Sequence, residues 1–170
     1  MNAEDLRSIQ APLKDRYKEE PKAALVTLHA EGRIGEGLSC KVETGKGLAV
    51  AGLHPATGGN GQALCSGDML LEALVACAGV TLNAVATAIG VELRDATLRA
   101  EGDLDFRGTL GVSKEAPVGF QNIRLVFTLD TDASEEQLAT LMKLTERYCV
   151  VYQTIAHPPQ MAIARKRAGA

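Results

Sequence analysis

A long apolar stretch, Ser66 to Gly90, constrains the fold of this chain more than any other segment. It reads SGDMLLEALVACAGVTLNAVATAIG, with Cys77 at its centre. From Met69 to Ile89 it is almost entirely apolar and rich in residues of high helix propensity. Ser66 is placed to cap the start of a helix, and Gly90 to end it. The stretch therefore predicts one long helix that is buried on nearly every side.

The length of this helix is also that of a membrane span, so its composition has to decide between two interpretations. Glu72, Asn83, two threonines and many alanines argue against a span, because spans prefer bulkier apolar residues and exclude carboxylates. The N-terminus, MNAEDLRSIQ, lacks the basic start, apolar run and small-residue cleavage site of a secretory signal. We therefore expect a cytoplasmic protein that does not associate with a membrane.

The composition of the chain limits the classes of protein to which it can belong. A chain of 170 residues with 46% hydrophobic and 23% charged residues is typical of one soluble globular domain. The net charge of -3 gives no electrostatic reason to expect nucleic acid. In a reducing cytoplasm a disulfide framework is not expected of the four cysteines, which are Cys40, Cys65, Cys77 and Cys149. No Cys/His cluster has metal-ligand spacing, so we expect neither a metal nor a bound cofactor.

The remaining segments predict an α+β fold with helices packed on antiparallel sheet. We expect three strands before the central helix and two after it, at 24–30, 38–42, 48–53, 91–106 and 122–129. A capping-box pattern at Asp132 or Ser134 predicts a second helix that ends near Tyr148. A short helix is expected after Cys149, then a final strand over 160–165. Residues 1–22 are expected to form a helical arm interrupted at Pro12, outside a domain that spans 23–170.

Cys77 and Cys149 each lie in an apolar segment, and two interpretations of the pair stay open. Buried free cysteines usually fill core space as small hydrophobic residues. Alternatively, a thiolate of one attacks an electrophile and the other resolves the product as a disulfide, which requires Cα atoms within about 7 Å. The sequence does not give this distance.

Two charged residues are candidates to serve such a thiolate. Arg33, in the predicted turn EGRIGEG, would lower the thiol pKa and orient a peroxide, although turn arginines are more often simply solvated. Asp68 begins the central helix, where a carboxylate also suits the free amides and the helix dipole. It precedes Cys77 by nine residues, roughly 180° around an ideal helix and about 13 Å along it. If both belong to one site, Asp68 must serve a second copy's cysteine, which implies an obligate dimer.

Four runs of the sequence resemble the OsmC/Ohr superfamily, the osmotically induced and organic hydroperoxide resistance proteins: AEGRIGEG, HPATGGNG, DMLLEALVACAG and YCVVYQTI. The resemblance covers the chain from about Ala24 to the C-terminus. It implies an OsmC-like, intertwined α+β homodimer whose long central helices carry a cysteine and pack in the interface, where the active sites lie. Many members are thiol-dependent peroxidases that act on organic hydroperoxides. A dithiol regenerates them, in the best-known branch a dihydrolipoyl protein.

The resemblance also implies roles for individual residues. Cys77 matches the peroxidatic cysteine, Cys149 the resolving cysteine, and Arg33 the arginine that orients the peroxide and holds the thiolate. Asp68 stands where OsmC-like members generally have a glutamate. The proline that typically follows the second cysteine is Val150 here. The expected function is therefore reduction of organic hydroperoxides through a Cys77 sulfenic acid and a Cys77/Cys149 disulfide, with an external dithiol as reductant.

Two other functions remain as alternatives. One is a non-catalytic OsmC-like module that binds an apolar ligand or acts as a redox sensor, and the other is a structural protein with core cysteines. If the chain is a peroxidase, apolar walls from the central helix and from Tyr148, Val151 and Phe120 are expected to favour alkyl or lipid hydroperoxides over hydrogen peroxide.

Overall fold

The structure is a computed structural model that describes residues 2–5, 8, 10–11, 19, 31–34, 39–44, 47–111 and 113–167, with the backbone alone for 31–47. Residues 3–5, 8, 10–11 and 19 are helical, and the arm predicted over 1–22 stays a prediction. The rest of that arm helix and the strand predicted at 24–30 lie outside the described residues. The described elements follow the order three strands, helix, two strands, two helices, with short elements between them.

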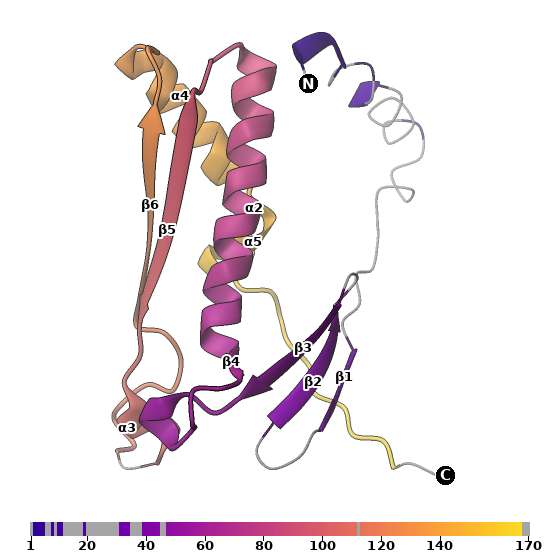
Figure 1. Cartoon of the computed structure of the whole chain (residues 1–170), viewed down its shortest axis with the longest axis vertical. Helices are drawn as coiled ribbons and strands as arrows, with labels where there is room; N and C mark the ends of the chain where they lie inside the picture. The colour runs from indigo at the N-terminus through magenta and orange to yellow at the C-terminus, as the bar shows by residue number, and fades with distance from the viewer. Residues whose placement is uncertain are drawn as a thin grey trace.

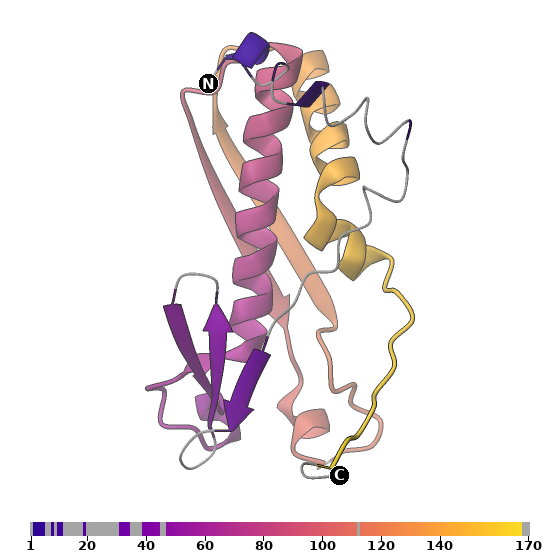
Figure 2. The same cartoon turned by 90° about the vertical axis from the view of Figure 1, so that its right-hand side faces the viewer.

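The centre of the molecule is helix α2, Ser66–Ile89, and one side of it is covered by a pair of strands (Figure 1). These strands are β5, Asp95–Asp103, and β6, Asn122–Asp130, paired antiparallel as predicted. Helices α4, Glu135–Tyr148, and α5, Val150–Ala156, follow β6. Figure 2 shows α4 beside α2 on the same face of the strand pair. This arrangement confirms the α+β class.

The strand pair has one apolar and one charged face. On both strands, partly buried residues such as Leu98 and Phe127 alternate with exposed ones and pack against α2 and α4. Arg124 and Asp103 form an ion pair on the outer face, and Arg94 pairs with Asp130 at the end of the strands. Exposed pairs of this kind contribute little to stability, so packing of the inner face holds the pair on the helices.

Helix α2 is buried along one stripe only. Its buried side chains recur at helical spacing, at Leu74, Ala78, Leu82, Val85 and Ala86. Val80, on another face, is 73% exposed, and only 22% of the helix's most apolar 18-residue window is buried. By length and composition alone α2 is also apolar enough to cross a membrane. The prediction of burial on nearly every side is wrong for a single chain, because its other faces lack a covering layer within the described residues.

Capping residues set the ends of the helices. Gly90 ends α2 in the left-handed region, with φ of 72°, as predicted. At its start, Cys65 is the N-cap and Ser66 the first helical residue, so the predicted serine cap is wrong by one position. Ser134 and Gln137 form the reciprocal capping box of α4, which confirms the second of the two predicted patterns.

The N-terminal strands form a separate four-stranded sheet in the order β1-β2-β3-β4. Their bounds are Glu31–Ile34, Ser39–Thr44, Gly47–Gly52 and Leu64–Cys65. Neighbours run antiparallel except β3 and β4, which are parallel. Arg33 is therefore a strand residue opposite Lys41, and its predicted place in a turn is wrong. The glycine that suggested the turn, Gly32, lies inside the ladder opposite Val42.

The connections at the base of α2 are short ordered elements. The 3-10 turn η2, Pro55–Thr57, lies between β3 and the base of α2, and the His54 side chain caps it by accepting from the Ala56 amide at 3.0 Å. The His54 ring stacks on Phe106, at 5.0 Å, where α3, Phe106–Thr109, begins. This stacking ties the two connections together. Figure 1 shows both of them beneath the central helix.

The strand predicted over 160–165 is absent from the described structure, in which residues 158–167 have no regular secondary structure. Figure 1 shows this tail leaving α5 and running down past the N-terminal strands. Met161 is 89% and Ile163 100% exposed. Their apolar alternation is that of a strand, but a strand also needs an edge to pair with, and no described strand pairs with this segment.

Candidate active site

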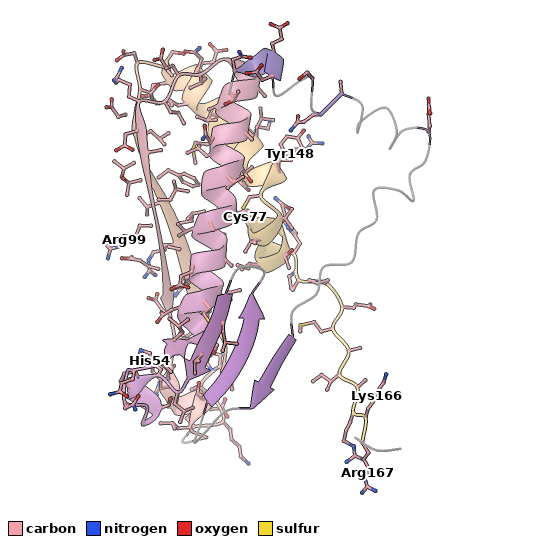
Figure 3. The ribbon with its side chains drawn as sticks, turned by 45° about the vertical axis from the view of Figure 1, so that its right-hand side comes forward. His54, Cys77, Arg99, Tyr148, Lys166 and Arg167 are labelled. Carbon is pink, nitrogen blue, oxygen red and sulfur yellow. The ribbon has the colours of Figure 1, made fainter. Side chains whose placement is uncertain are left out.

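The thiols of Cys77 and Cys149 meet where the middle of α2 packs against α5. Figure 3 shows Cys77 halfway along α2, beside α5. Cys149 is 1% exposed and shares a buried cluster with Leu74 and Ala78, against which Cys77 packs. The Cys149 thiol is close enough to Cys77 to lower its pKa. The structure therefore brings together two of the four predicted site residues, although they are far apart in sequence.

A break in the helical chain positions Cys149. Its backbone is extended, with φ of -72° and ψ of 106°, so it is at once the C-cap of α4 and the N-cap of α5. The first amides of a helix have no partner within the helix. Here the backbone N–H groups of Val150 and Val151 act on the Cys77 thiol as donors that lower its pKa. The break thus directs two backbone donors at the other cysteine.

A third donor comes from α2 itself. Thr81 lies four residues after Cys77, which places both side chains on one face of the helix. Its hydroxyl also acts on the Cys77 thiol and lowers its pKa. The sequence interpretation missed Thr81, although its spacing from Cys77 was a usable signal. It also missed the backbone donors, for which a sequence carries no signal.

These contacts shift the two thiol pKa values in opposite directions. Burial of Cys77 favours its neutral form, but the hydrogen bonds from Val151, Cys149, Val150 and Thr81 outweigh burial and lower its pKa. The pKa of Cys149 is raised, first by burial and then by its hydrogen bond to Cys77 and the charge there. Cys77 is therefore the more acidic thiol, and Cys149 stays protonated and donates to it.

The two other predicted site residues are not brought to this pair in the described structure. Arg33 has its backbone in β1, and its side chain lies outside the described residues. Asp68 is exposed on the first turn of α2. Because α2 is unbroken between Asp68 and Cys77, the two lie about 13 Å apart along its axis. The roles predicted for Arg33 and Asp68 stay predictions.

A cavity of about 470 Å³ lies on the α2 surface next to Thr81 and is lined by Val80, Ala84 and Tyr148. Tyr148 is 57% exposed, and Figure 3 shows it beside α2, above Cys77. Phe120, predicted to share an apolar wall with Tyr148, lies elsewhere and lines a separate cavity with Leu74 and Ile155. In the described part of the chain, no three His, Cys, Asp or Glu side chains gather as metal ligands do.

Known structures share this architecture. An OsmC-like protein from Mycoplasma pneumoniae is 15% identical and superposes with a TM-score of 0.66 over 78% of this chain and 89% of that one. An organic hydroperoxide resistance protein from Elizabethkingia anophelis gives a TM-score of 0.63 at 15% identity, over 79% and 91%. OhrB of Bacillus subtilis gives 0.53 at 19% identity, over 79% and 94%. At these identities the likeness establishes the fold.

The family is established by the sequence. No curated protein matches the chain by sequence comparison. The family model described as OsmC-like protein matches residues 59–164, which is more than half of the chain and includes both α2 and the Cys149 segment. The chain therefore belongs to the OsmC-like protein family.

Proposed function

We propose that this protein is a thiol-dependent peroxidase that reduces organic hydroperoxides with Cys77 and is regenerated by an external dithiol. The observation that carries the proposal is the pairing of an acidic Cys77 with a protonated, buried Cys149. The thiolate is the reactive form of a cysteine, and a neighbouring thiol is what a resolving step requires. Two of the structural relatives, from Elizabethkingia anophelis and Bacillus subtilis, are organic hydroperoxide resistance proteins, which favours the same substrate class.

In the proposed mechanism Cys77 reacts with the hydroperoxide, and Cys149 donates a proton and then resolves the oxidised Cys77. The Cys77 thiolate attacks the distal oxygen of the hydroperoxide, the O–O bond breaks, and Cys77 becomes a sulfenic acid. Cys149, already donating to Cys77, gives its proton to the departing alkoxide, which leaves as an alcohol. The resulting Cys149 thiolate attacks the sulfenic sulfur, and hydroxide leaves to take up a proton as water. A dithiol then reduces the Cys77/Cys149 disulfide.

We further propose that the working form is a homodimer with composite sites. An exposed apolar side chain such as Val80, at 73%, on the long central helix is costly in a monomer and is explained by a covering subunit. The unpaired tail with exposed Met161 and Ile163 also fits an exchange of segments between subunits. In such a dimer Asp68 would serve the other subunit's Cys77, and Arg33 would reach a thiolate.

The dimer can be tested by placing a charge on this face of α2. Val80→Glu is expected to shift the sedimentation equilibrium strongly toward monomer, because a carboxylate would be buried in the interface. Val126, 52% exposed on the outer face of β6, provides the control. Val126→Glu is expected to leave the mass unchanged. A wild-type protein that sediments as a monomer would contradict the composite site.

The peroxidase itself is tested by anaerobic titration with cumene hydroperoxide. We expect one equivalent to consume two of the four thiols per chain and to form a Cys77/Cys149 disulfide. Cys77→Ser should abolish this loss. The control is Cys65→Ser, a free thiol on β4 that the mechanism does not use. Thiols that stay unchanged in the wild type would end the proposal in favour of a non-catalytic ligand-binding module.

A further inference from the structure

A second cavity reaches Cys149 without touching Cys77. It encloses about 390 Å³ between β6 and the α4–α5 junction. Leu125 and Phe127 of β6 and Met142 of α4 give it apolar walls, and the exposed Lys143 and Glu146 also belong to its lining. Cys149 is part of the wall, although it is 1% exposed. The cavity beside Thr81 and Tyr148 includes neither cysteine, so the two cavities approach the thiol pair from different elements.

The wall of this cavity carries an unpartnered hydroxyl. Thr145 is 1% exposed, and its Oγ1 is the one buried side-chain polar atom without a hydrogen-bond partner in the described part of the chain. Helical threonines usually donate to a preceding carbonyl, as Thr140 does to Glu136 at 3.0 Å and Thr154 to Val150 at 2.8 Å. A buried hydroxyl left unpaired is costly. Because Thr145 lines the cavity, a ligand with a polar group can satisfy it.

The chemistry of the pair decides which sulfur a reductant attacks. Thiol–disulfide exchange is fastest when the thiol that leaves has the lower pKa. In the reduced protein that thiol is Cys77, whose sulfur is stabilised by the amides of Val150 and Val151. The attacking sulfur must also line up opposite the leaving sulfur. Attack on Cys149 therefore has to come from the side of Cys149 that faces away from Cys77.

We propose that the cavity lined by Cys149 and Thr145 is the entry site of the dithiol reductant, which attacks the Cys149 sulfur. A reductant thiolate forms a bond to Cys149, the Cys77–Cys149 bond breaks, and Cys77 leaves as a thiolate. The second thiol of the reductant, deprotonated, then attacks its own sulfur of the mixed disulfide. This releases Cys149 as a thiolate, which takes up a proton, and the oxidised reductant leaves as a cyclic disulfide. The site rests on the proposed function for the disulfide it reduces.

The cavity also fits the class of reductant that the resemblance to the OsmC/Ohr superfamily implies, a dihydrolipoyl dithiol. Its volume falls in the range of small-molecule sites, and its walls are mainly hydrocarbon. A dithiol on a saturated chain would pack its methylenes against Leu125, Phe127 and Met142. An amide or hydroxyl on that chain would pair with Thr145. Dihydrolipoamide has all of these features, whereas dithiothreitol lacks the chain.

The first test locates the mixed disulfide. The Cys77/Cys149 disulfide is made with diamide, so that the test does not depend on peroxide turnover. It is mixed with 6-mercaptohexanol, a single thiol on a hydrocarbon chain, and quenched in acid, and the adduct is located by peptide mass spectrometry. We expect the adduct on Cys149, with Cys77 as a free thiol. An adduct on Cys77 would overturn the proposal, even in a protein whose peroxidase activity is confirmed.

The second test closes the mouth of the cavity. Lys143→Trp is expected to slow reduction of the disulfide by dihydrolipoamide about tenfold, a change of about 1.4 kcal/mol in the barrier, while oxidation by hydroperoxide is unchanged. Glu136→Trp, about two turns earlier on the same face of α4 and also exposed, is the matched control and should alter neither rate. Equal reduction rates in the two variants would refute entry through this cavity.

The third test removes the hydroxyl without changing the shape of the wall. Thr145→Val should raise the KM for dihydrolipoamide about fivefold, because one hydrogen bond to the reductant is lost. The rate of reduction by dithiothreitol and the peroxide step should stay the same. A dihydrolipoamide KM equal to that of the wild type would show that Thr145 does not contact the reductant.

Discussion

Cys77 lies in the middle of an unbroken helix, whereas Cys149 lies at a break between two helices. The unbroken helix leaves Cys77 without free amides of its own, because each backbone N–H around it is used within α2. The break at Cys149 frees the first amides of α5, and these lower the pKa of the other thiol. The low pKa of Cys77 therefore depends on the backbone next to Cys149.

The same break keeps Cys149 neutral. Cys149 is buried, and its neighbour carries the charge, so both effects raise its pKa. A fold that placed both thiols at helix starts would make both acidic, and two thiolates in contact would repel each other. The unlike environments let one thiol attack while the other still holds a proton to donate.

The prediction with the largest expected effect concerns the removal of each thiol in turn. Cys149→Ser is expected to consume one equivalent of hydroperoxide and stop, because Cys77 is oxidised but has no resolving thiol. A stable sulfenic acid on Cys77 should then be trapped by dimedone and located by mass spectrometry. Cys77→Ser should yield no dimedone adduct at all. An adduct on Cys149 in that variant would show that the two thiols are chemically equivalent.

The second prediction concerns pH. Alkylation of Cys77 by iodoacetamide requires the thiolate, so its rate should rise with pH and reach half its maximum below 9.0, the ordinary value for a thiol pKa. As pH falls through the lowered pKa, the rate should fall with the thiolate fraction. Cys149, with its raised pKa, should be modified only at higher pH. Peptide mass spectrometry resolves the two sites, and coincident midpoints would contradict the comparison.

The third prediction removes one backbone donor. Val150 is the first residue of α5, where proline fits a helix, and the extended backbone of Cys149 is what a following proline requires. Val150→Pro deletes an N–H that hydrogen-bonds Cys77 and should raise the Cys77 pKa. The expected result is a roughly fivefold slower reaction with hydroperoxide at neutral pH, measured by stopped flow.

A matched control is available at the other helix of this region. Glu135 is the first residue of α4, so Glu135→Pro introduces the same residue at the same helical position without touching Cys77. It should leave the alkylation midpoint where it is in the wild type.

Much of the fold could be predicted from local patterns. The alternation of β6, the glycine end of α2 at Gly90 and the capping box at Ser134 depend on neighbours within a few residues, and all three are confirmed. The wrong predictions concern partners that are distant in sequence. The segment over 160–165 has strand alternation but no strand to pair with among the described residues, and α2 is apolar enough for burial on all sides but is covered on one.

The candidate site could also be predicted only in part from the sequence. The resemblance to the OsmC/Ohr superfamily selected Cys77 and Cys149, and the structure places them in contact. The donors that make Cys77 acidic include two backbone amides. Every residue except proline carries such an amide, so these donors cannot be recognised from the residue types in the sequence. The cavity behind Cys149 depends on how α4 packs against β6, which the pattern of neither element specifies.

The smallest expected effect tests how much α2 itself contributes to the acidity of Cys77. Thr81→Val removes the one side-chain hydroxyl that hydrogen-bonds Cys77 and should shift the alkylation midpoint upward by less than Val150→Pro does. The peroxide reaction at neutral pH should slow about twofold. Thr87 on the same helix donates to the Asn83 carbonyl, at 2.8 Å, so Thr87→Val is the control and should change nothing. If Thr81→Val shifts the midpoint more than Val150→Pro does, the acidity of Cys77 comes from its own helix, and the break at Cys149 is not its source.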